Sequence, residues 1–149
     1  MQFTIESPDQ ADVRALIAEL DAYQSSLYPA ESNHLLDIRS LCLPAVLFAV
    51  ARDTHGVAQA CGAVVLQSGY GEVKRMFVRP ALRGQGVAAR MMSFLEEQAR
   101  GKGCHALMLE TGIHQPEAIA LYRRFGYVDC PPFGEYREDP LSLFMRKDL

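Results

Sequence analysis

The chain has 149 residues and a formal net charge of −3, and 49% of its residues are hydrophobic and 22% charged. These proportions are ordinary for a globular protein and exclude a disordered or fibrous chain. The length suits one domain, which we expect to span residues 1–149. A negative net charge argues against a nucleic-acid partner held through its phosphates.

The sequence carries no pattern typical of export or membrane insertion. Its start, MQFTIESPDQ, lacks a basic region followed by an apolar core, and no apolar run approaches the roughly 20 residues of a membrane span. We therefore expect a soluble, cytoplasmic protein with no membrane partner. The cysteines are widely spaced and predict reduced thiols rather than disulfides; they are Cys42, Cys61, Cys104 and Cys130.

The first quarter of the chain predicts a strand followed by helical segments. Residues 2–6 form a short strand that Ser7-Pro8 ends. Residues 9–23 place apolar side chains on one helical face, with acidic residues near the N-terminal end. Residues 24–32 are expected to be a connector, and residues 33–41 a short second helix capped by Ser32 or Asn33.

Three strands are predicted in the middle of the chain. The runs 44–52 and 57–67 are rich in β-formers and joined by a turn, which predicts an antiparallel hairpin with a bulge at Gly62. Residues 72–78 form the third strand, which Pro80 stops. Alternation along it is expected to put Glu72, Lys74 and Met76 on one face.

The helix that follows is amphipathic. Val87, Met91, Leu95 and Ala99 recur every four residues, whereas the charged residues are expected to face water; these are Arg90, Glu96, Glu97 and Arg100. A glycine stop leads into a strand at residues 104–110, which is expected to run parallel to residues 72–78.

The last third of the chain predicts one more helix and a final strand. Pro116 suits the first helical position, and Gly126 ends an apolar face that carries Tyr122. Residues 141–146 are apolar enough for a strand that closes the sheet. The expected fold is therefore a mixed α/β sheet of about six or seven strands with four helices.

The segment Arg83-Gly84-Gln85-Gly86-Val87-Ala88 joins the central strand to the amphipathic helix. The first turn of a helix leaves N–H groups without internal partners, and those groups bind anions. Glycines allow a phosphate to approach the backbone, and Arg83 adds a positive charge. This loop is therefore expected to bind a phosphate-bearing ligand.

Other interpretations of this loop fit less well. A dinucleotide-binding motif requires its first glycine directly after the strand and an acidic residue about 20 positions later. Here residues 79–83 intervene, and Glu96 and Glu97 come too early. A P-loop is excluded because no Gly-Lys-Ser/Thr follows. An ordinary tight turn into a core helix remains the simplest alternative.

Two segments together resemble the GCN5-related N-acetyltransferases. Arg83-x-x-Gly86-x-Ala88 is similar to the family signature that grips the pyrophosphate of acetyl-coenzyme A. Residues 118–127, AIALYRRFGY, are similar to the family's Ala-x-x-x-Tyr-x-x-x-Gly-Phe/Tyr block. The resemblance covers about residues 2–147 and extends to a bacterial subgroup of small acetyltransferases.

The resemblance implies a binding site for acetyl-coenzyme A. In the family, main-chain N–H groups of the central strand hold the thioester carbonyl, and that strand splays from its neighbour to admit the pantetheine arm. Gln115 stands where many members carry an asparagine that contacts the cofactor. The implied cofactor-binding residues are Met76, Phe77, Val78, Arg83, Gly84, Gln85, Gly86, Val87, Ala88, Gln115 and Tyr122.

The resemblance also implies the catalytic groups. Tyr122 stands at the position of the family's general acid, and a phenol is protonated at neutral pH and can donate to a leaving thiolate. Glu72 resembles the glutamate base of some members; a solvated glutamate paired with Lys74 or Arg75 is the alternative. Glu110 is the second choice of base and His114 the third.

Specificity on such scaffolds is carried by loops, so the acceptor is expected to contact the connector and the late loop. The predicted substrate-binding residues are Tyr28, Glu110, His114 and Tyr136, and Glu31, His34 and Phe133 are further candidates in the same loops. Aromatic and acidic groups together suit a cationic amine.

These observations predict an N-acetyltransferase that moves acetyl from acetyl-coenzyme A to a primary amine by direct transfer in a ternary complex. The acceptor is a small molecule, an amino acid or a peptide. A non-catalytic acyl-coenzyme A sensor is the alternative, and O-acetylation or a longer acyl group also stays open. No metal is expected, because the histidines lack ligand spacing. A homodimer through the last strands is common among relatives.

Overall fold

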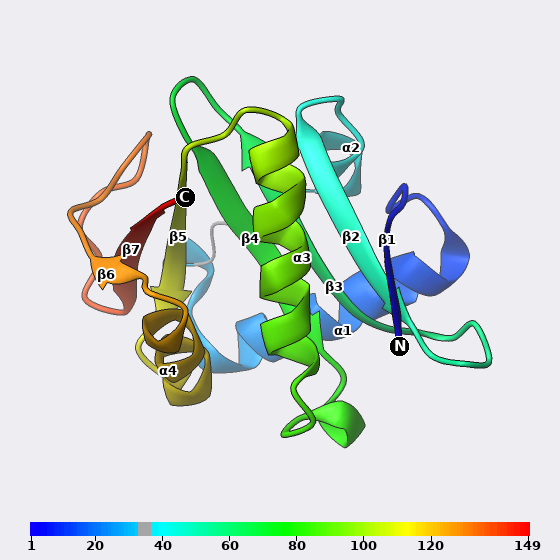
Figure 1. Cartoon of the computed structure of the whole chain (residues 1–149). Helices are drawn as coiled ribbons and strands as arrows, with labels where there is room; N and C mark the ends of the chain where they lie inside the picture. Colours follow the sequence, from blue (N-terminus) through cyan, green and yellow to red (C-terminus); the bar gives the residue numbers. More distant parts are fainter. Residues whose placement is uncertain (33–36) are drawn as a thin grey trace.

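The computed structural model describes residues 1–32 and 37–149. One seven-stranded sheet, in the order β1-β2-β3-β4-β5-β7-β6, forms its centre (Figure 1). Strands β4 and β5 run parallel, as predicted, and every other neighbouring pair is antiparallel. The strands are β1 (Gln2–Ile5), β2 (Val46–Arg52), β3 (Ala58–Leu66), β4 (Gly71–Val78), β5 (Ala106–Gly112), β6 (Val128–Asp129) and β7 (Ser142–Asp148).

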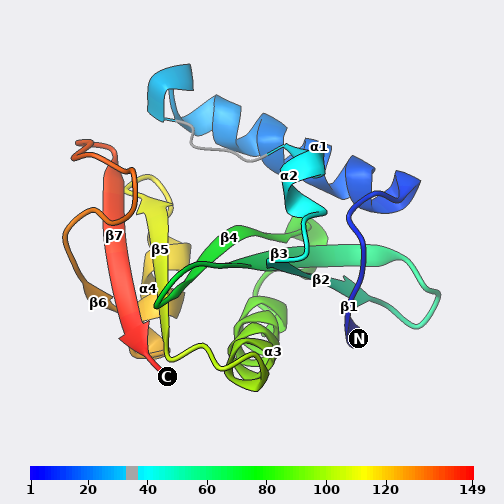
Figure 2. The same ribbon diagram turned by 90° about the horizontal axis from the view of Figure 1, so that it is seen from above.

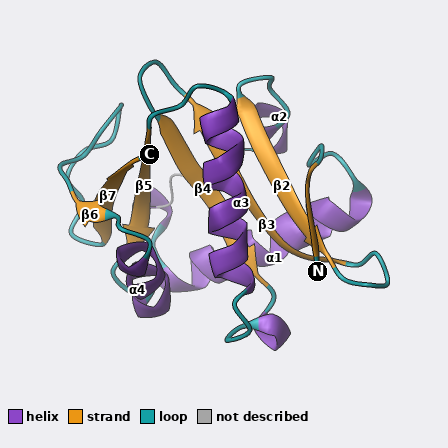
Figure 3. Ribbon diagram, viewed as in Figure 1, coloured by secondary structure: helices purple, strands orange, loops and turns teal. Residues whose placement is uncertain are grey.

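Helices cover both faces of the sheet (Figures 2 and 3). On one face lie α1 and α2, and on the other lie α3 and α4. Their bounds are α1 (Ala11–Leu27), α2 (Ile38–Leu41), α3 (Val87–Gly101) and α4 (Pro116–Arg124), and single 3₁₀ turns lie at η1 (Ala30–Ser32) and η2 (Pro80–Leu82). The predicted mixed α/β architecture is therefore confirmed.

Two boundaries and one strand differ from the prediction. Helix α1 continues to Leu27, beyond the predicted end at Tyr23, and its last turn is closed by the Tyr28 N–H, which donates to Gln24 O. The cap of α2 is Asp37, whose carboxylate accepts from the Ser40 N–H at 2.8 Å. The predicted start of that helix and His34 lie outside the described residues. Strand β6 is two residues long, too short to carry a pattern.

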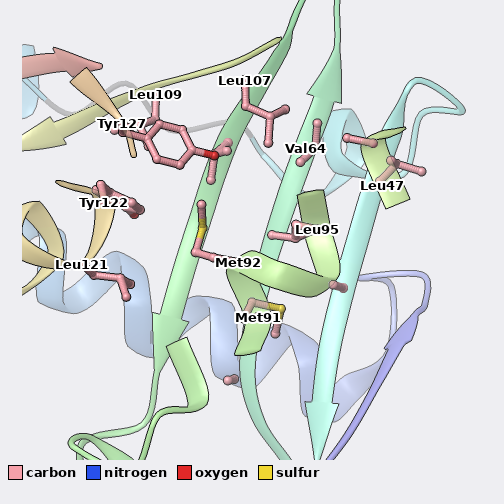
Figure 4. Packing of buried hydrophobic residues seen from close by; sticks show 14 of the residues in the cluster. Leu47, Val64, Met91, Met92, Leu95, Leu107, Leu109, Leu121, Tyr122 and Tyr127 are labelled. Atoms are coloured by element: carbon pink, nitrogen blue, oxygen red, sulfur yellow. The ribbon is translucent and has the colours of Figure 1, made fainter. Parts of the chain in front are cut away.

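The larger part of the core lies between the sheet and α3. Met91, Met92 and Leu95 of α3 pack against Leu107 and Leu109 of β5 and against residues of β2 and β3 (Figure 4). A second cluster joins α1 and α2 to the opposite face through Val13, Leu16, Ile17, Leu41 and Phe48. The sheet is thus buried on both faces, which fixes the position of each strand along its length.

One predicted surface residue is buried instead. Glu96 of α3 is 4% exposed, whereas its place on the helix predicted a water-facing side chain. Lys147 Nζ donates to both carboxylate oxygens, at 2.8 and 3.1 Å, and the hydroxyl of Tyr127 donates at 3.1 Å. The periodicity of the helix could not show this burial, because the partners come from distant parts of the chain: Lys147 from β7 and Tyr127 from the segment between α4 and β6.

Strand β4 contains a bulge opposite Gly62. On β3, Cys61 pairs with Phe77 and Ala63 pairs with Lys74, so two residues of β4, Arg75 and Met76, face one residue of β3. The expected irregularity at Gly62 is confirmed, although the additional residue lies on the partner strand. The sequence predicted Glu72, Lys74 and Met76 on one face of the strand, and this prediction is wrong for Met76. The bulge breaks the alternation, so Met76 packs with the α3 side of the core.

The bulge coincides with the place where β4 leaves β5. The parallel pairing comprises Gly71 with Leu107, Glu72 with Met108 and Val73 with Leu109, and it stops there. Beyond these pairs the two strands diverge towards the end where α4 and the loop before α3 lie (Figure 1). The sheet therefore opens between two strands that are paired only at their first residues.

We predict that Gly62→Ala destabilises the fold. A Cβ at this position would lie 2.5 Å from Met76 Sδ and 3.0 Å from Leu95 Cδ1. Overpacking of this kind lowers the free energy of unfolding by about 1–3 kcal/mol, which urea unfolding followed by circular dichroism will measure. Gly101→Ala is the control, because nothing lies within 4 Å of its added Cβ. Equal stability of the two variants would contradict the tight packing at the bulge.

Candidate active site

A cavity of about 100 Å³ lies where β4 and β5 separate. Its walls come from the first half of β4, from the end of β5 and from the last turns of α1. The residues that line it include Leu20, Gln24, Tyr28, Glu72, Lys74, Arg75, Met76, Glu110, Gly112, Gln115 and Tyr122. The predicted acid, two predicted bases and three predicted substrate-binding or cofactor-binding residues (Tyr28, Met76 and Gln115) therefore meet in one place.

A larger groove of about 680 Å³ begins beside this cavity. It runs between the end of β4, the first turn of α3 and one face of α4, and Leu20 and Gln115 line both spaces. Seven of the predicted cofactor-binding residues line it: Phe77, Val78, Arg83, Gly84, Gly86, Val87 and Ala88, together with Gln115 at the junction. The groove thus extends from the loop before α3 to the cavity.

The loop before α3 has the geometry expected of an anion site. Gly84 and Gly86 have φ angles of +79° and +78°, and nothing lies within 4 Å of a Cβ built on either. Glycine is thus required for conformation, while the space above stays open for a ligand. Gly86 caps α3 without any side-chain hydrogen bond, so the N–H groups of the first helical turn remain available.

Arg83 lies across this groove. Its Nε donates to the carbonyl oxygen of Val78 at 3.1 Å, and its guanidinium stands over the rings of Tyr23 and Phe77 at 5.2 and 5.7 Å. Gln85 is the exception among the predicted loop residues, because its side chain turns back to donate to Ala81 O at 3.4 Å and does not line the groove.

Tyr122 is held by α4 with its ring buried. The residue is 7% exposed and packs edge-on against Tyr127, with ring centroids 5.9 Å apart. Burial raises the pKa of the Tyr122 phenol to about 12. The group is therefore fully protonated at neutral pH and lines the cavity as a proton donor.

Glu72 belongs to a cluster with Lys74 and Tyr136. The Tyr136 hydroxyl donates to Glu72 Oε2 at 2.5 Å, and Lys74 Nζ lies 2.7 Å from that hydroxyl and 3.3 Å from Glu72 Oε2. Burial, followed by the adjacent carboxylate, raises the pKa of Tyr136. The loop between β6 and β7 thus reaches the predicted base through Tyr136, a contact that the sequence alone could not show. Lys74, which the sequence analysis named only as a possible ion-pair partner of Glu72, also belongs to the site.

One further opening adjoins this cluster. A groove of about 770 Å³, lined by Ser40, Leu43, Val65, Tyr70, Gly134 and Glu135, also reaches Glu72, Lys74 and Tyr136. Glu110 lies on the cavity side, where its Oε2 accepts from Ser142 Oγ at 2.8 Å. Both carboxylates are therefore engaged by hydroxyl donors.

Tyr28 connects the acceptor side with the cofactor side. Its hydroxyl donates to Gln115 Oε1 and accepts from the His114 N–H, each at 3.2 Å, and its ring stacks on His114. Gly112 is required beneath it, since a Cβ there would lie 1.7 Å from the Tyr28 oxygen. Gln115 thus remains at the predicted cofactor position and is oriented by a predicted substrate residue.

The backbone of β4 presents polar groups to the opening. Arg79 N–H donates to Gln59 O of β3, so in an antiparallel ladder the peptide groups of Val78 point the other way. The carbonyl of Val78 confirms this direction, because it accepts from Arg83. By the same alternation the N–H of Phe77, one of the implied cofactor-binding residues, points towards β3, whereas that of Val78 faces the gap. The bulge ends this alternation before Met76.

Over residues 1–32 and 37–149, no three His, Cys, Asp or Glu side chains are grouped closely enough to hold a metal ion. In the same part of the chain, no helix is long and apolar enough to cross a bilayer.

The model of the acetyltransferase (GNAT) family matches residues 13–127. The chain belongs to this family. It is 53% identical to an IAA acetyltransferase of Azospirillum brasilense over 97% of this chain and 95% of that protein. It is 34% identical to the uncharacterized N-acetyltransferase YsnE of Bacillus subtilis over the full length of both. The chain is thus an acyltransferase that uses acetyl-coenzyme A, and the binding-only alternative is disfavoured.

Solved structures agree with the fold. A Klebsiella pneumoniae protein described as a candidate acyl-CoA N-acyltransferase shares 42% identity and superposes with a TM-score of 0.85, over 99% of this chain and 97% of that one. An aminoglycoside 6′-N-acetyltransferase complexed with coenzyme A gives a TM-score of 0.73 at 16% identity, over 99% and 97% of the two chains. At that identity the likeness concerns the fold alone.

We predict that Arg83→Ala weakens coenzyme A binding about tenfold, because a charge-assisted hydrogen bond to phosphate contributes about 1.5–3 kcal/mol. Isothermal titration calorimetry at two salt concentrations measures the affinity, and the effect should shrink at high salt. Arg90→Ala is the matched control: this α3 arginine stacks on Phe3, outside the groove, and should bind coenzyme A like wild type. Equal losses in both variants would contradict the assignment of the loop.

Proposed function

We propose that the protein transfers the acetyl group of acetyl-coenzyme A directly to the amine of a small molecule, an amino acid or a peptide while both substrates are bound. The observation that carries this proposal is the meeting of three spaces. The cofactor groove and the central cavity share Leu20 and Gln115, and the groove beside Tyr136 shares Glu72 and Lys74 with that cavity. Two substrates can thus reach one point by separate routes.

The groove fits the cofactor by its donor set. A diphosphate requires a positive, donor-rich cradle, and the N–H groups at the start of α3 with Arg83 supply one. The open edge of β4 offers Val78 N–H and C=O to the amide groups of a pantetheine arm, once Arg83 has released that carbonyl. The bound thioester supplies the acetyl group, and Met76 N–H faces the position of its carbonyl.

Tyr122 acts as the general acid in this proposal. A thiolate leaves when the thioester breaks, and a protonated phenol in the same cavity can donate to it. Because burial raises the pKa of Tyr122 to about 12, the phenol stays protonated at neutral pH and keeps a proton to donate.

Glu72 is the base that the geometry favours. It is 7% exposed, lies on the wall between cavity and acceptor groove, and is held in place by the Tyr136 hydroxyl. An attacking ammonium group must lose a proton, and this carboxylate can accept it directly or through one water. Glu110 lines the same cavity but does not line the groove beside Tyr136, so it is the second candidate for the base.

The choice of acceptor compounds to test is guided by the named relatives more than by the shape of the groove. The protein that is 53% identical is named for IAA, which makes IAA the first compound to test. Amino acids, polyamines, aminoglycosides and short peptides complete the panel. The aromatic side chains around the acceptor groove, Tyr70, Phe133 and Tyr136, suit an acceptor with a flat apolar part beside its amine.

We predict thiol release from acetyl-coenzyme A with one class of this panel, and a loss of at least tenfold in kcat for Tyr122→Phe. The reason is that phenylalanine keeps the buried ring and removes only the proton donor. Coenzyme A affinity by calorimetry and the melting temperature serve as controls and should stay unchanged. Binding without turnover on any acceptor would count against the transferase, and full activity of the variant would remove Tyr122 from the mechanism.

We predict that Tyr136→Phe lowers kcat/KM by about tenfold. The hydroxyl donates to Glu72 Oε2 and holds this carboxylate in place, so its removal leaves the proposed base less well oriented. The comparison variants are Glu72→Gln, which should abolish turnover, and Glu110→Gln, which should keep it. Loss of turnover in Glu110→Gln instead would assign the base to that residue.

A further inference from the structure

Arg75 has a backbone conformation that no other described residue except glycine adopts. Its φ is +60°, in the left-handed region, where a side chain costs about 1–2 kcal/mol. The residue occupies the first position of the β4 bulge, two residues after the last pair that β4 makes with β5. A strained arginine thus lies at the point where the sheet opens.

The side chain of Arg75 is buried and tied to α1. Its exposed fraction is 2%, and Nη2 donates to Asp21 Oδ1 at 2.5 Å. Its Nε and Nη1 are buried with no partner in the described part of the chain. Burying a guanidinium with incomplete pairing is unfavourable, so this contact is maintained against a desolvation cost. Its effect is to fix the bulge relative to α1.

The peptide that follows Arg75 is also held by Cys61 of β3, which packs in the cluster beneath α1. The thiol of Cys61 donates to the Arg75 carbonyl oxygen, with a sulfur-to-oxygen distance of 3.2 Å. Burial raises the pKa of this thiol to about 12, so it remains a donor. All described peptide bonds are trans, and in a trans peptide the C=O and N–H groups point in opposite directions. The N–H of Met76 therefore points away from Cys61 and β3.

We propose that Arg75 is a positioning residue for acetyl transfer: its ion pair with Asp21, together with the Cys61 thiol, holds the peptide whose Met76 N–H receives the thioester carbonyl. This inference rests on the proposed function. The carbonyl oxygen gains negative charge when the amine attacks, so a fixed donor stabilises the transition state more than the ground state. Arg75 does not itself contact the reacting atoms.

The test compares two ligands that differ only at the carbonyl, so it does not need the natural acceptor. Acetyl-coenzyme A and its thioether analogue S-ethyl coenzyme A are titrated into wild type, and the ratio of their affinities reports the carbonyl donor. Arg75→Gly suits this test because glycine adopts a φ of +60° without strain, so the variant removes the side chain and its ion pair and still allows the backbone conformation of the bulge. Asp21→Asn keeps Arg75 and removes the counter-charge, in case the glycine variant unfolds.

The expected result is a loss of carbonyl recognition with the rest of the cofactor site intact. Wild type should prefer acetyl-coenzyme A by at least threefold. Arg75→Gly should reduce this preference to near one and should bind coenzyme A within twofold of wild type. In an assay of acetyl-coenzyme A hydrolysis without any acceptor, the variant should release thiol at least tenfold more slowly than wild type. Asp21→Asn should give a smaller change in the same direction.

Two further variants provide controls. Arg79→Ala removes another ion pair between the end of β4 and α1, that of Arg79 with Glu19 at 2.7 Å, outside the bulge, and should keep the preference. Cys61→Ser keeps a donor to the Arg75 carbonyl, whereas Cys61→Ala removes it and should weaken the preference. A lower melting temperature with an unchanged ratio would mark Arg75 as merely structural and overturn the inference.

Other outcomes are also decisive. An Arg75→Gly variant that changes only the KM of an acceptor would place the guanidinium in acceptor binding and contradict the positioning role. A wild type that binds both ligands equally would contradict a carbonyl donor at Met76, while leaving the transferase in place. A wild type that binds neither acetyl-coenzyme A nor coenzyme A would instead refute the proposed function itself.

Discussion

The divergence of β4 from β5 is the constraint on which the rest of this structure depends. Two neighbouring parallel strands normally pair along their whole length, yet here the ladder stops after Val73 and Leu109. The bulge at Arg75 and Met76 bends β4 away, and the freed edges become the walls of a cavity. The backbone groups that the missing ladder would have used have no partner strand there, so the opening supplies both space and hydrogen-bond donors.

Around this opening each element has a distinct task. The α3 side of the sheet carries most of the packed core and holds the anion-binding turn at its N-terminal end. The α1 side carries Leu20, Tyr28 and the Asp21 carboxylate, which meet β4 and the residues before α4. The late loop brings Tyr136 across to Glu72. The packed core on the α3 side thus supports the polar residues that line the cavity beside α1.

The polar residues of the site are joined more closely than a catalytic scheme of isolated acid and base suggests. Glu72, Lys74 and Tyr136 share hydrogen bonds, and Tyr28 links Gln115 to His114. In a low-dielectric cavity such contacts orient each group. The position of Glu72 is therefore set partly by the loop that carries Tyr136, which also borders the groove beside this cluster.

The sequence by itself determined the order of the elements, the anion-binding loop and the place of Tyr122, because each rests on local patterns: apolar periodicity, glycine before a helix and a motif of fixed spacing. Only the tertiary structure decided which side chains meet. Glu96 is buried because Lys147 and Tyr127 come from other elements, and Met76 changes face because one bulge residue shifts the alternation. Arg75 gave no sequence signal, since a left-handed arginine and its contact with Asp21 arise from strand and helix packing rather than from any local preference.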